Sequence, residues 1–144
     1  MAHSYLLAVD GSSGSQKAVE YAIAQAKLSG AEIILAYVIE WSPYAFNTPE
    51  ENANRHKRRE EELERAKNLV VSPVATELRE AGLTVTTEVQ HGNTAKTLIE
   101  IALNHNVSQI LVGRQGESGL KSLLFGSIAA NLVQSSPLPV TVVP

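Results

Sequence analysis

The sequence predicts a single α/β domain in which a five-stranded parallel sheet carries helices on both faces, a Rossmann-like arrangement. Short apolar runs alternate along the chain with longer segments of helical periodicity, which is the pattern of repeated strand–helix–strand units. Right-handed crossovers between parallel strands place such helices on both faces. The 144 residues, 44% of them hydrophobic, are enough for one buried core, and no linker or internal repeat divides residues 1–144.

Composition excludes several classes of protein. The net charge of -3 gives no general attraction to nucleic acid or to anionic lipid. The absence of cysteine excludes disulfides, thiolate metal sites and thiol nucleophiles. The first ten residues lack a basic segment and are interrupted by Asp10, and no apolar stretch approaches the ~18 residues needed to span a bilayer. We therefore expect a cytoplasmic protein without membrane insertion.

Apolar and β-branched runs predict the strands. The five predicted strands are Tyr5–Val9, Ile33–Ile39, Val85–Val89 continuing toward His91-Gly92, Gln109–Val112 and Val140–Val143.

Capping and breaking residues predict the helices. Ser13-Gly-Ser-Gln16 matches a capping box for a helix that Gly30 ends. Thr48-Pro-Glu-Glu51 opens a long helix that runs toward Gly82, with a kink or break near Ser72 because Pro73 follows. Asn93 or Thr94 caps the next helix, and Ser127 begins the last.

A glycine-bearing loop leaves the fourth strand and enters the last helix. Its spacing, Gly113-x2-Gly116-x9-Gly126-Ser127, brings backbone N–H groups, a hydroxyl and a helix N-terminus together. This combination is typical of phosphate binding. The segment is neither a Walker A motif, since Leu120 stands where the second glycine is required, nor a dinucleotide fingerprint.

Asp10 directly follows the first strand, as Gly113 follows the fourth. Because the carboxyl ends of parallel strands share one edge of the sheet, the two residues are expected on the same rim, where ligands bind in such sheets. An aspartate in this position is also a common turn former or helix cap, so both roles stay open.

Several segments resemble the universal stress protein family. The glycine spacing matches its nucleotide-binding signature, and the flanking segments agree with it: Leu6-Leu-Ala-Val-Asp-Gly-Ser12, Ala36-Tyr-Val-Ile39, Ser118-Gly-Leu-Lys-Ser-Leu-Leu-Phe-Gly-Ser-Ile128 and Ser136-Pro-Leu-Pro-Val-Thr-Val-Val143. The resemblance covers the whole chain. It implies a five-stranded parallel sheet of the adenine nucleotide alpha hydrolase-like type, a homodimer, and bound ATP.

The resemblance also implies a role for particular residues. Asp10 would meet the ribose hydroxyls, Val38 the adenine through its backbone, and the glycine loop the ribose and phosphates, with Mg²⁺ bound through the phosphates. The implied binding residues are Ala8, Val9, Asp10, Val38, Gly113, Arg114, Gly116, Gly119, Gly126, Ser127 and Ile128. Glu117 is at odds with this set, because it places a negative charge in the phosphate loop.

The fifth strand has an apolar, β-branched edge with no helix after it in the sequence. Such an edge is a liability unless it is paired, and pairing with the same strand of a second copy gives a two-fold dimer. The resemblance implies the same arrangement.

The leading functional hypothesis is an ATP-binding regulatory protein of the universal stress type that acts on unknown client proteins. A slow ATPase or autophosphorylating enzyme is the alternative, with Glu117 or a metal as the agent and Ser118, Ser122 or Ser127 as acceptors. A nucleotide-free dimeric scaffold is a third hypothesis. AMP or a cyclic nucleotide also stays open as the ligand, because the loop identifies phosphate more firmly than phosphate number.

Three other features favour ordinary structural roles. The charged run Arg55–Arg65 is expected to form a solvated helix face with Lys57–Glu61 and Arg58–Glu62 pairs. The four histidines lack metal-ligand spacing, although His91 follows a strand end and could approach the rim. The aromatic loop with Trp41, Tyr44 and Phe46 is expected to be a local hydrophobic cover or part of a lid.

Overall fold

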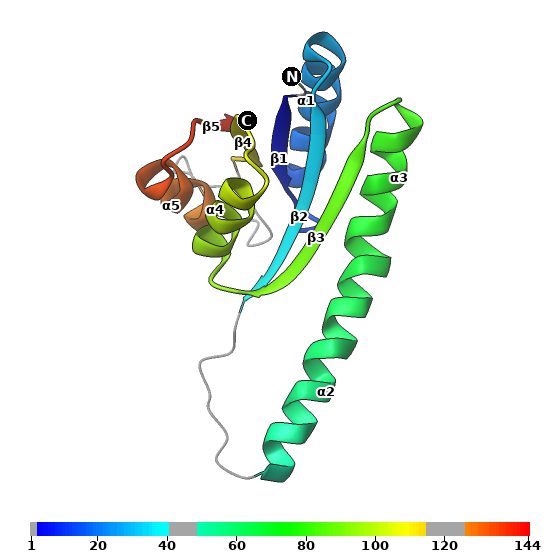
Figure 1. The fold of residues 1–144 in the computed structure, drawn as a ribbon, viewed down its shortest axis with the longest axis vertical. Helices are drawn as coiled ribbons and strands as arrows, with labels where there is room; N and C mark the ends of the chain where they lie inside the picture. The colour runs from blue at the N-terminus through cyan, green and yellow to red at the C-terminus, as the bar shows by residue number, and fades with distance from the viewer. Residues whose placement is uncertain (1–2, 41–48, 115–125) are drawn as a thin grey trace.

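The computed structural model describes residues 3–40, 49–114 and 126–144, and the side chains of these ranges except at 49–55. The chain forms one parallel sheet of five strands in the order β3-β2-β1-β4-β5 (Figure 1). The elements in chain order are β1 Ser4–Ala8, α1 Ser13–Ser29, β2 Glu32–Glu40, α2 Pro49–Ala66, η1 Lys67–Val71, α3 Ser72–Glu80, β3 Val85–Gly92, α4 Thr94–Asn104, β4 Gln109–Gly113, α5 Ser127–Ser135 and β5 Val140–Val143. The predicted fold class is confirmed.

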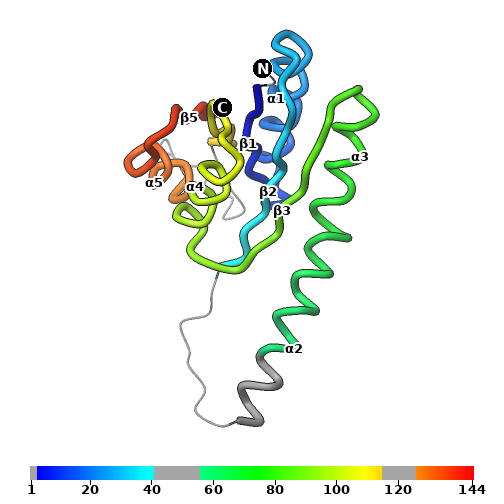
Figure 2. The backbone as a smooth tube through the Cα atoms, viewed as in Figure 1, coloured from blue at the N-terminus to red at the C-terminus, as the bar shows by residue number. Residues whose placement is uncertain are grey.

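Two hydrophobic cores lie on opposite faces of the sheet. On β1, Leu7 packs toward α1 and α3, whereas Leu6 packs toward α4 and α5, as the alternation of side chains along a strand requires. Both leucines are fully buried, because β1 is the central strand and is covered on both sides. The tube in Figure 2 shows the same division, with α4 and α5 on the opposite side of the sheet from α1 and α3.

The edge strands differ in length. β3 runs from Val85 to Gly92, so it ends at His91-Gly92 as predicted, and it pairs with β2 along its whole length, from Ile33↔Val85 to Glu40↔Gly92. β5 is short and pairs with β4 only from Val140 to Val143. In Figure 1, β2 and β3 extend well beyond the other strands toward the lower part of the view.

The first helix begins one residue earlier than the capping box predicts. Ser12, not Ser13, is the N-cap, and its hydroxyl accepts a hydrogen bond from the Ser15 N–H. Gln16, expected to complete the box, instead donates its side-chain amide to Glu77 of α3 at 3.0 Å. The box prediction was wrong because Gln16 has a tertiary partner, which the local sequence does not reveal.

The break expected near Ser72 is a π-helical turn rather than an interruption. Residues Lys67–Val71 form this turn, and the Ser72 N–H bonds to the Lys67 carbonyl, one residue further back than in an α-helix. The wider turn lies directly before Pro73, whose ring would crowd the carbonyl four residues earlier in a regular α-helix. As a result, α2 and α3 run on as one rod beside β3 (Figure 1).

Candidate functional site

A cleft of about 560 Å³ lies at the carboxyl ends of β1, β2 and β4, and we call it the carboxyl-edge cleft. Every described member of the predicted binding set lines it: Ala8, Val9, Asp10, Val38, Gly113, Arg114, Gly126, Ser127 and Ile128. Gly116 and Gly119 lie outside the described residues, as do Glu117, Ser118 and Ser122. The topology therefore brings together residues that are more than 100 positions apart in the sequence.

Asp10 holds the turn between β1 and α1. One of its carboxylate oxygens, Oδ1, accepts hydrogen bonds from the Ser12 N–H at 2.9 Å and the Ser15 hydroxyl at 2.6 Å. The Ser15 hydroxyl in turn accepts from the Asp10 N–H at 2.9 Å. Both roles left open by the sequence are thus compatible: Asp10 is a turn former, and it also lines the cleft.

Gly113 is required for close packing. A Cβ atom at this position would lie 2.5 Å from the Gly14 carbonyl oxygen and 2.7 Å from the Gly14 carbonyl carbon, which is too close for any real contact. The last residue of β4 therefore sits directly against the backbone of the first turn of α1. This contact brings the end of β4 and the Asp10 turn to the same wall of the cleft.

The N-terminus of α5 opens onto the cleft, and no side chain in the described part of the chain caps it. Gly126 is the N-cap, and no described side chain accepts a hydrogen bond from the first turn, whereas Ser12 caps α1 and Asn93 caps α4. The first N–H groups of a helix need partners and carry the positive end of its dipole. The uncapped first turn, with the Ser127 hydroxyl beside it, is therefore suited to an anion.

Two backbone hydrogen bonds fix where that helix begins. The Arg114 N–H donates to the Val143 carbonyl at 2.7 Å, so the chain leaving β4 stays in the sheet for one more residue. The Gly126 N–H then donates to the Arg114 carbonyl at 2.8 Å, which places the start of α5 beside the end of β4. The α5 end of the cleft is thus anchored to the sheet.

The floor and the far wall of the cleft are largely apolar. Ala8, Val38 and Val112 come from three adjacent strands and are more than 90% buried, and Leu98 of α4 and Ile128 of α5 face them. Such a surface accommodates a flat, weakly polar group beside the polar α5 end.

The sequence reasoning missed several cleft residues, which are Ser15, Tyr37, Ile39, Glu40, Thr94, Leu98, Val112 and Ala129. Glu40 and Thr94 had a detectable signal, since each directly follows a predicted strand end or its turn. The Thr94 hydroxyl donates to Glu40 Oε1 at 2.8 Å, although the two are 54 positions apart. Ser15, Leu98 and Ala129 gave no such signal, because they lie inside helical segments.

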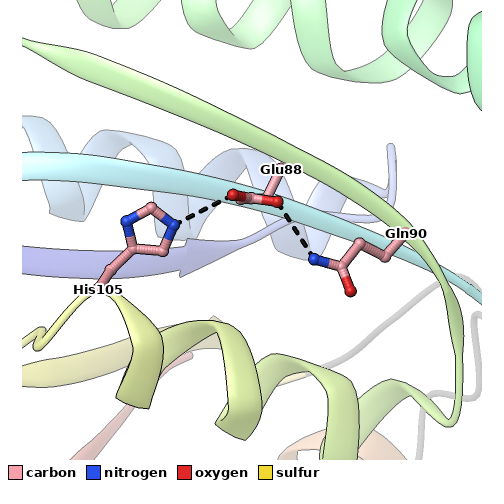
Figure 3. A network of polar contacts seen from close by, with 3 residues as sticks. All are labelled: Glu88, Gln90 and His105. Carbon is pink, nitrogen blue, oxygen red and sulfur yellow. Dashed lines mark hydrogen bonds and ion pairs between the residues drawn. The ribbon is translucent and has the colours of Figure 1, made fainter.

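The remaining candidates lie away from the cleft lining. His91 contacts Glu62 of α2 at 3.0 Å, and the i,i+4 pair found among the described residues of α2 is His56–Glu60 in place of the predicted Lys57–Glu61 and Arg58–Glu62. His105 contacts Glu88, which also accepts from Gln90 (Figure 3). No group of three or more metal-ligating side chains occurs among the described residues. The aromatic loop lies outside them.

Within the same described ranges, no helix is both long and apolar enough to traverse a bilayer.

Known proteins resemble this chain in both sequence and structure. A universal stress protein of Methanocaldococcus jannaschii is 30% identical over 138 residues, covering 96% of this chain and 79% of its own. The structure of the hypothetical protein MJ0577 superposes with a TM-score of 0.85 at 26% identity, covering 99% of this chain and 96% of that one.

A universal stress protein crystallised in complex with cAMP shares the fold, with a TM-score of 0.64, 24% identity, and coverage of 99% of this chain and 96% of that one. The model of the universal stress protein family matches residues 1–144. With its five-stranded parallel sheet, this chain belongs to the universal stress protein family.

Proposed function

We propose that this protein binds an adenine nucleotide, in the first instance ATP, in the carboxyl-edge cleft. The phosphates lie at the N-terminus of α5, the ribose lies near Asp10, and the base lies against Val38. The observation that carries the proposal is the uncapped first turn of α5 at one end of a cleft whose floor is apolar. Gly116 and Gly119 complete the phosphate loop in this proposal, as the family signature implies.

Three further points support an adenine nucleotide. The cleft volume of about 560 Å³ lies in the range of small-molecule sites. Asp10 follows β1, which lies between β2 and β4 in the sheet, so it lines the cleft between Val38 and the proposed phosphate position, where a ribose would present its hydroxyls. A protein with the same fold has been crystallised with cAMP, which contains the same base and sugar.

Magnesium fits this site only as a companion of the phosphates. Mg²⁺ usually keeps several waters and binds through substrate phosphates and one or two carboxylates. Among the described residues no cluster of three ligating side chains could hold the ion without a nucleotide. Asp10 is the carboxylate nearest to the proposed ribose, and the ion would otherwise be held by the triphosphate and water.

We propose that the nucleotide serves regulation in a cytoplasmic homodimer, with client proteins as targets. The dimer forms through β5, whose outer edge has no partner strand among the described elements. Nucleotide state then changes the surface that the clients meet.

Acid extraction tests the ligand directly. Purified protein is denatured with acid, and the released small molecules are separated by chromatography. We expect an adenine nucleotide in near-stoichiometric amount, or, if purification strips it, saturable binding when Mg-ATP is titrated by calorimetry. Absence of both would overturn the proposal. Chromatography also distinguishes ATP from AMP and cAMP.

A charge placed at the start of α5 tests the phosphate position. Ser127→Glu puts a carboxylate where the phosphates are proposed, so we expect ATP affinity to fall more than about tenfold, from like-charge repulsion. An acidic residue at a helix N-terminus stabilises the helix, so folding should be preserved. Ser135→Glu, with the same change at the other end of α5, should leave affinity within about twofold. Equal effects of the two variants would contradict the assignment.

A further inference from the structure

The carboxyl-edge cleft has two ends of opposite electrostatic character. At the β4 end lie the uncapped first turn of α5 and the backbone of Gly113 and Arg114. At the β2 end lies the carboxylate of Glu40. Neighbouring strands are about 4.8 Å apart, so β2 and β4, on either side of β1, are about 10 Å apart. A negatively charged ligand group is favoured at the first end and repelled at the second.

Glu40 is held in place by the helix that follows β3. Its Oε1 accepts a hydrogen bond from the hydroxyl of Thr94, the first residue of α4, at 2.8 Å. Thr94 is 7% exposed, so this hydroxyl has little freedom to turn to solvent. The side chain of Glu40 is itself exposed and lines the cleft, and no described residue hydrogen-bonds its second oxygen, Oε2. The pair therefore presents one fixed, charged acceptor at the β2 end.

Glu40 shares a face of the sheet with the apolar floor. Side chains alternate along β2, so Ala36, Val38 and Glu40 point to the α4–α5 side. A base lying against Val38 thus meets the Glu40 carboxylate at its outer edge. A carboxylate accepts hydrogen bonds and cannot donate them, so it favours a base edge that carries a donor.

We infer that Glu40, oriented by Thr94, selects the base of the ligand by accepting a hydrogen bond from an exocyclic amino group, as found at position 6 of adenine. The inference rests on the proposed nucleotide function and adds to it a side chain that distinguishes one base from another. Selection arises because a base without that amino group leaves the carboxylate facing a carbon-bound hydrogen or another acceptor.

The test compares ATP with purine riboside triphosphate, which lacks only the 6-amino group. Calorimetry in magnesium buffer gives both affinities for the unaltered protein. A hydrogen bond to a charged group corresponds to about tenfold or more in affinity, so we expect ATP to bind at least about tenfold more tightly. Equal binding of the two ligands overturns the inference, whereas failure of both to bind overturns the proposed function instead.

Glu40→Gln isolates the acceptor. With Thr94 donating to the amide oxygen, the amide NH₂ replaces Oε2, so a donor faces the amino group. We expect the preference for ATP over purine riboside triphosphate to fall about tenfold from its value in the unaltered protein, because the hydrogen bond to the charged acceptor is lost. Removing the negative charge affects both triphosphates alike, so the ratio of affinities is the decisive quantity.

Glu32→Gln is the matched control, because Glu32 is an exposed glutamate at the opposite end of the same strand. It should retain the full preference. Binding of purine riboside triphosphate by Glu40→Gln shows that the phosphate and ribose contacts remain intact in the variant. A Glu40→Gln protein whose preference for ATP is unchanged would assign recognition of the amino group to another part of the cleft and overturn the inference.

Discussion

Gly113 is the residue at which the hydrophobic core and the cleft constrain each other. The family signature suggests that this glycine gives a phosphate access to the backbone. In the structure, packing against α1 already requires a glycine here, since a Cβ would lie 2.5 Å from the Gly14 carbonyl oxygen. Its backbone lies outside the left-handed region, so the requirement is for space and not for an unusual conformation.

Gly113→Ala should therefore destabilise the fold even without nucleotide. Overpacking a close contact costs about 1–3 kcal/mol, and here the opposing atoms are backbone and cannot rotate away. Urea unfolding monitored by circular dichroism measures the loss. Gly30→Asn is the control: its site is left-handed with nothing near the added Cβ, and asparagine tolerates that conformation. A fully stable Gly113→Ala protein would contradict the packing argument.

Among the elements, strands were easier to predict than the ends and partners of helices. Buried parallel strands have continuous apolar runs, so β1, β2, β4 and β5 appear in the sequence within a residue or two of their bounds. The N-cap of α1 could not be predicted from the sequence, because Ser12 and Ser13 are equally good caps and because Gln16 hydrogen-bonds to Glu77. Tertiary contacts decide such cases, and they have no local signature.

The contact between α2 and β3 is another tertiary contact that the local sequence does not reveal. Glu62 reaches His91, which is only 11% exposed, across the gap between the long helix and the edge strand. By contrast, the nearby Glu60 contacts His56 within the helix itself, and both are largely exposed.

Glu62→Ala should thus loosen α2 locally. A partly exposed ion pair or hydrogen bond is worth about 1 kcal/mol or less, so amide exchange in residues 56–66 should accelerate up to about fivefold. Hydrogen exchange followed by mass spectrometry gives the rates. Glu60→Ala removes the same type of side chain from the same helix but leaves the contact with β3 intact, so it should accelerate exchange in residues 56–66 less than Glu62→Ala does. Equal acceleration of residues 56–66 in the two variants would contradict a role for the Glu62–His91 contact in holding α2 against β3.

At the scale of the whole molecule, the location of the site followed from topology while its full lining did not. Asp10 and Gly113 each follow a strand end, so their common rim could be predicted from strand order alone. The contributions of Ser15, Leu98 and Ala129 depend on how helices lie over the sheet, which no spacing in the sequence encodes. Glu40 and Thr94 fall between these cases, because their positions were predictable but their hydrogen bond was not.

The proposed dimer depends on the backbone groups at the outer edge of β5. The Pro139 and Val143 carbonyls point toward β4, where they accept from Ile110 and Arg114. Backbone groups alternate along a strand, so those of Val140 and Val142 point to the open edge. An outer strand would pair with these groups.

Val142→Pro should dissociate the dimer, because it removes an N–H from the open edge and leaves the β4 ladder intact. Sedimentation analysis should show a monomer. Val142→Ala keeps that N–H while losing part of the side chain, so it should remain a dimer and controls for packing. If the proline variant sediments as a dimer, the subunits associate through another surface.

The hydrogen bond between Gly126 and Arg114 has a consequence for how such proteins diversify. It holds the two ends of the segment 115–125 together at 2.8 Å, on atoms that belong to the sheet and to the start of a helix. The entropy lost in closing a loop depends only weakly on its length once its ends are fixed. Segments of different length and sequence could therefore be grafted between these two anchor points, changing what is bound while the scaffold beneath continues to fold unaided.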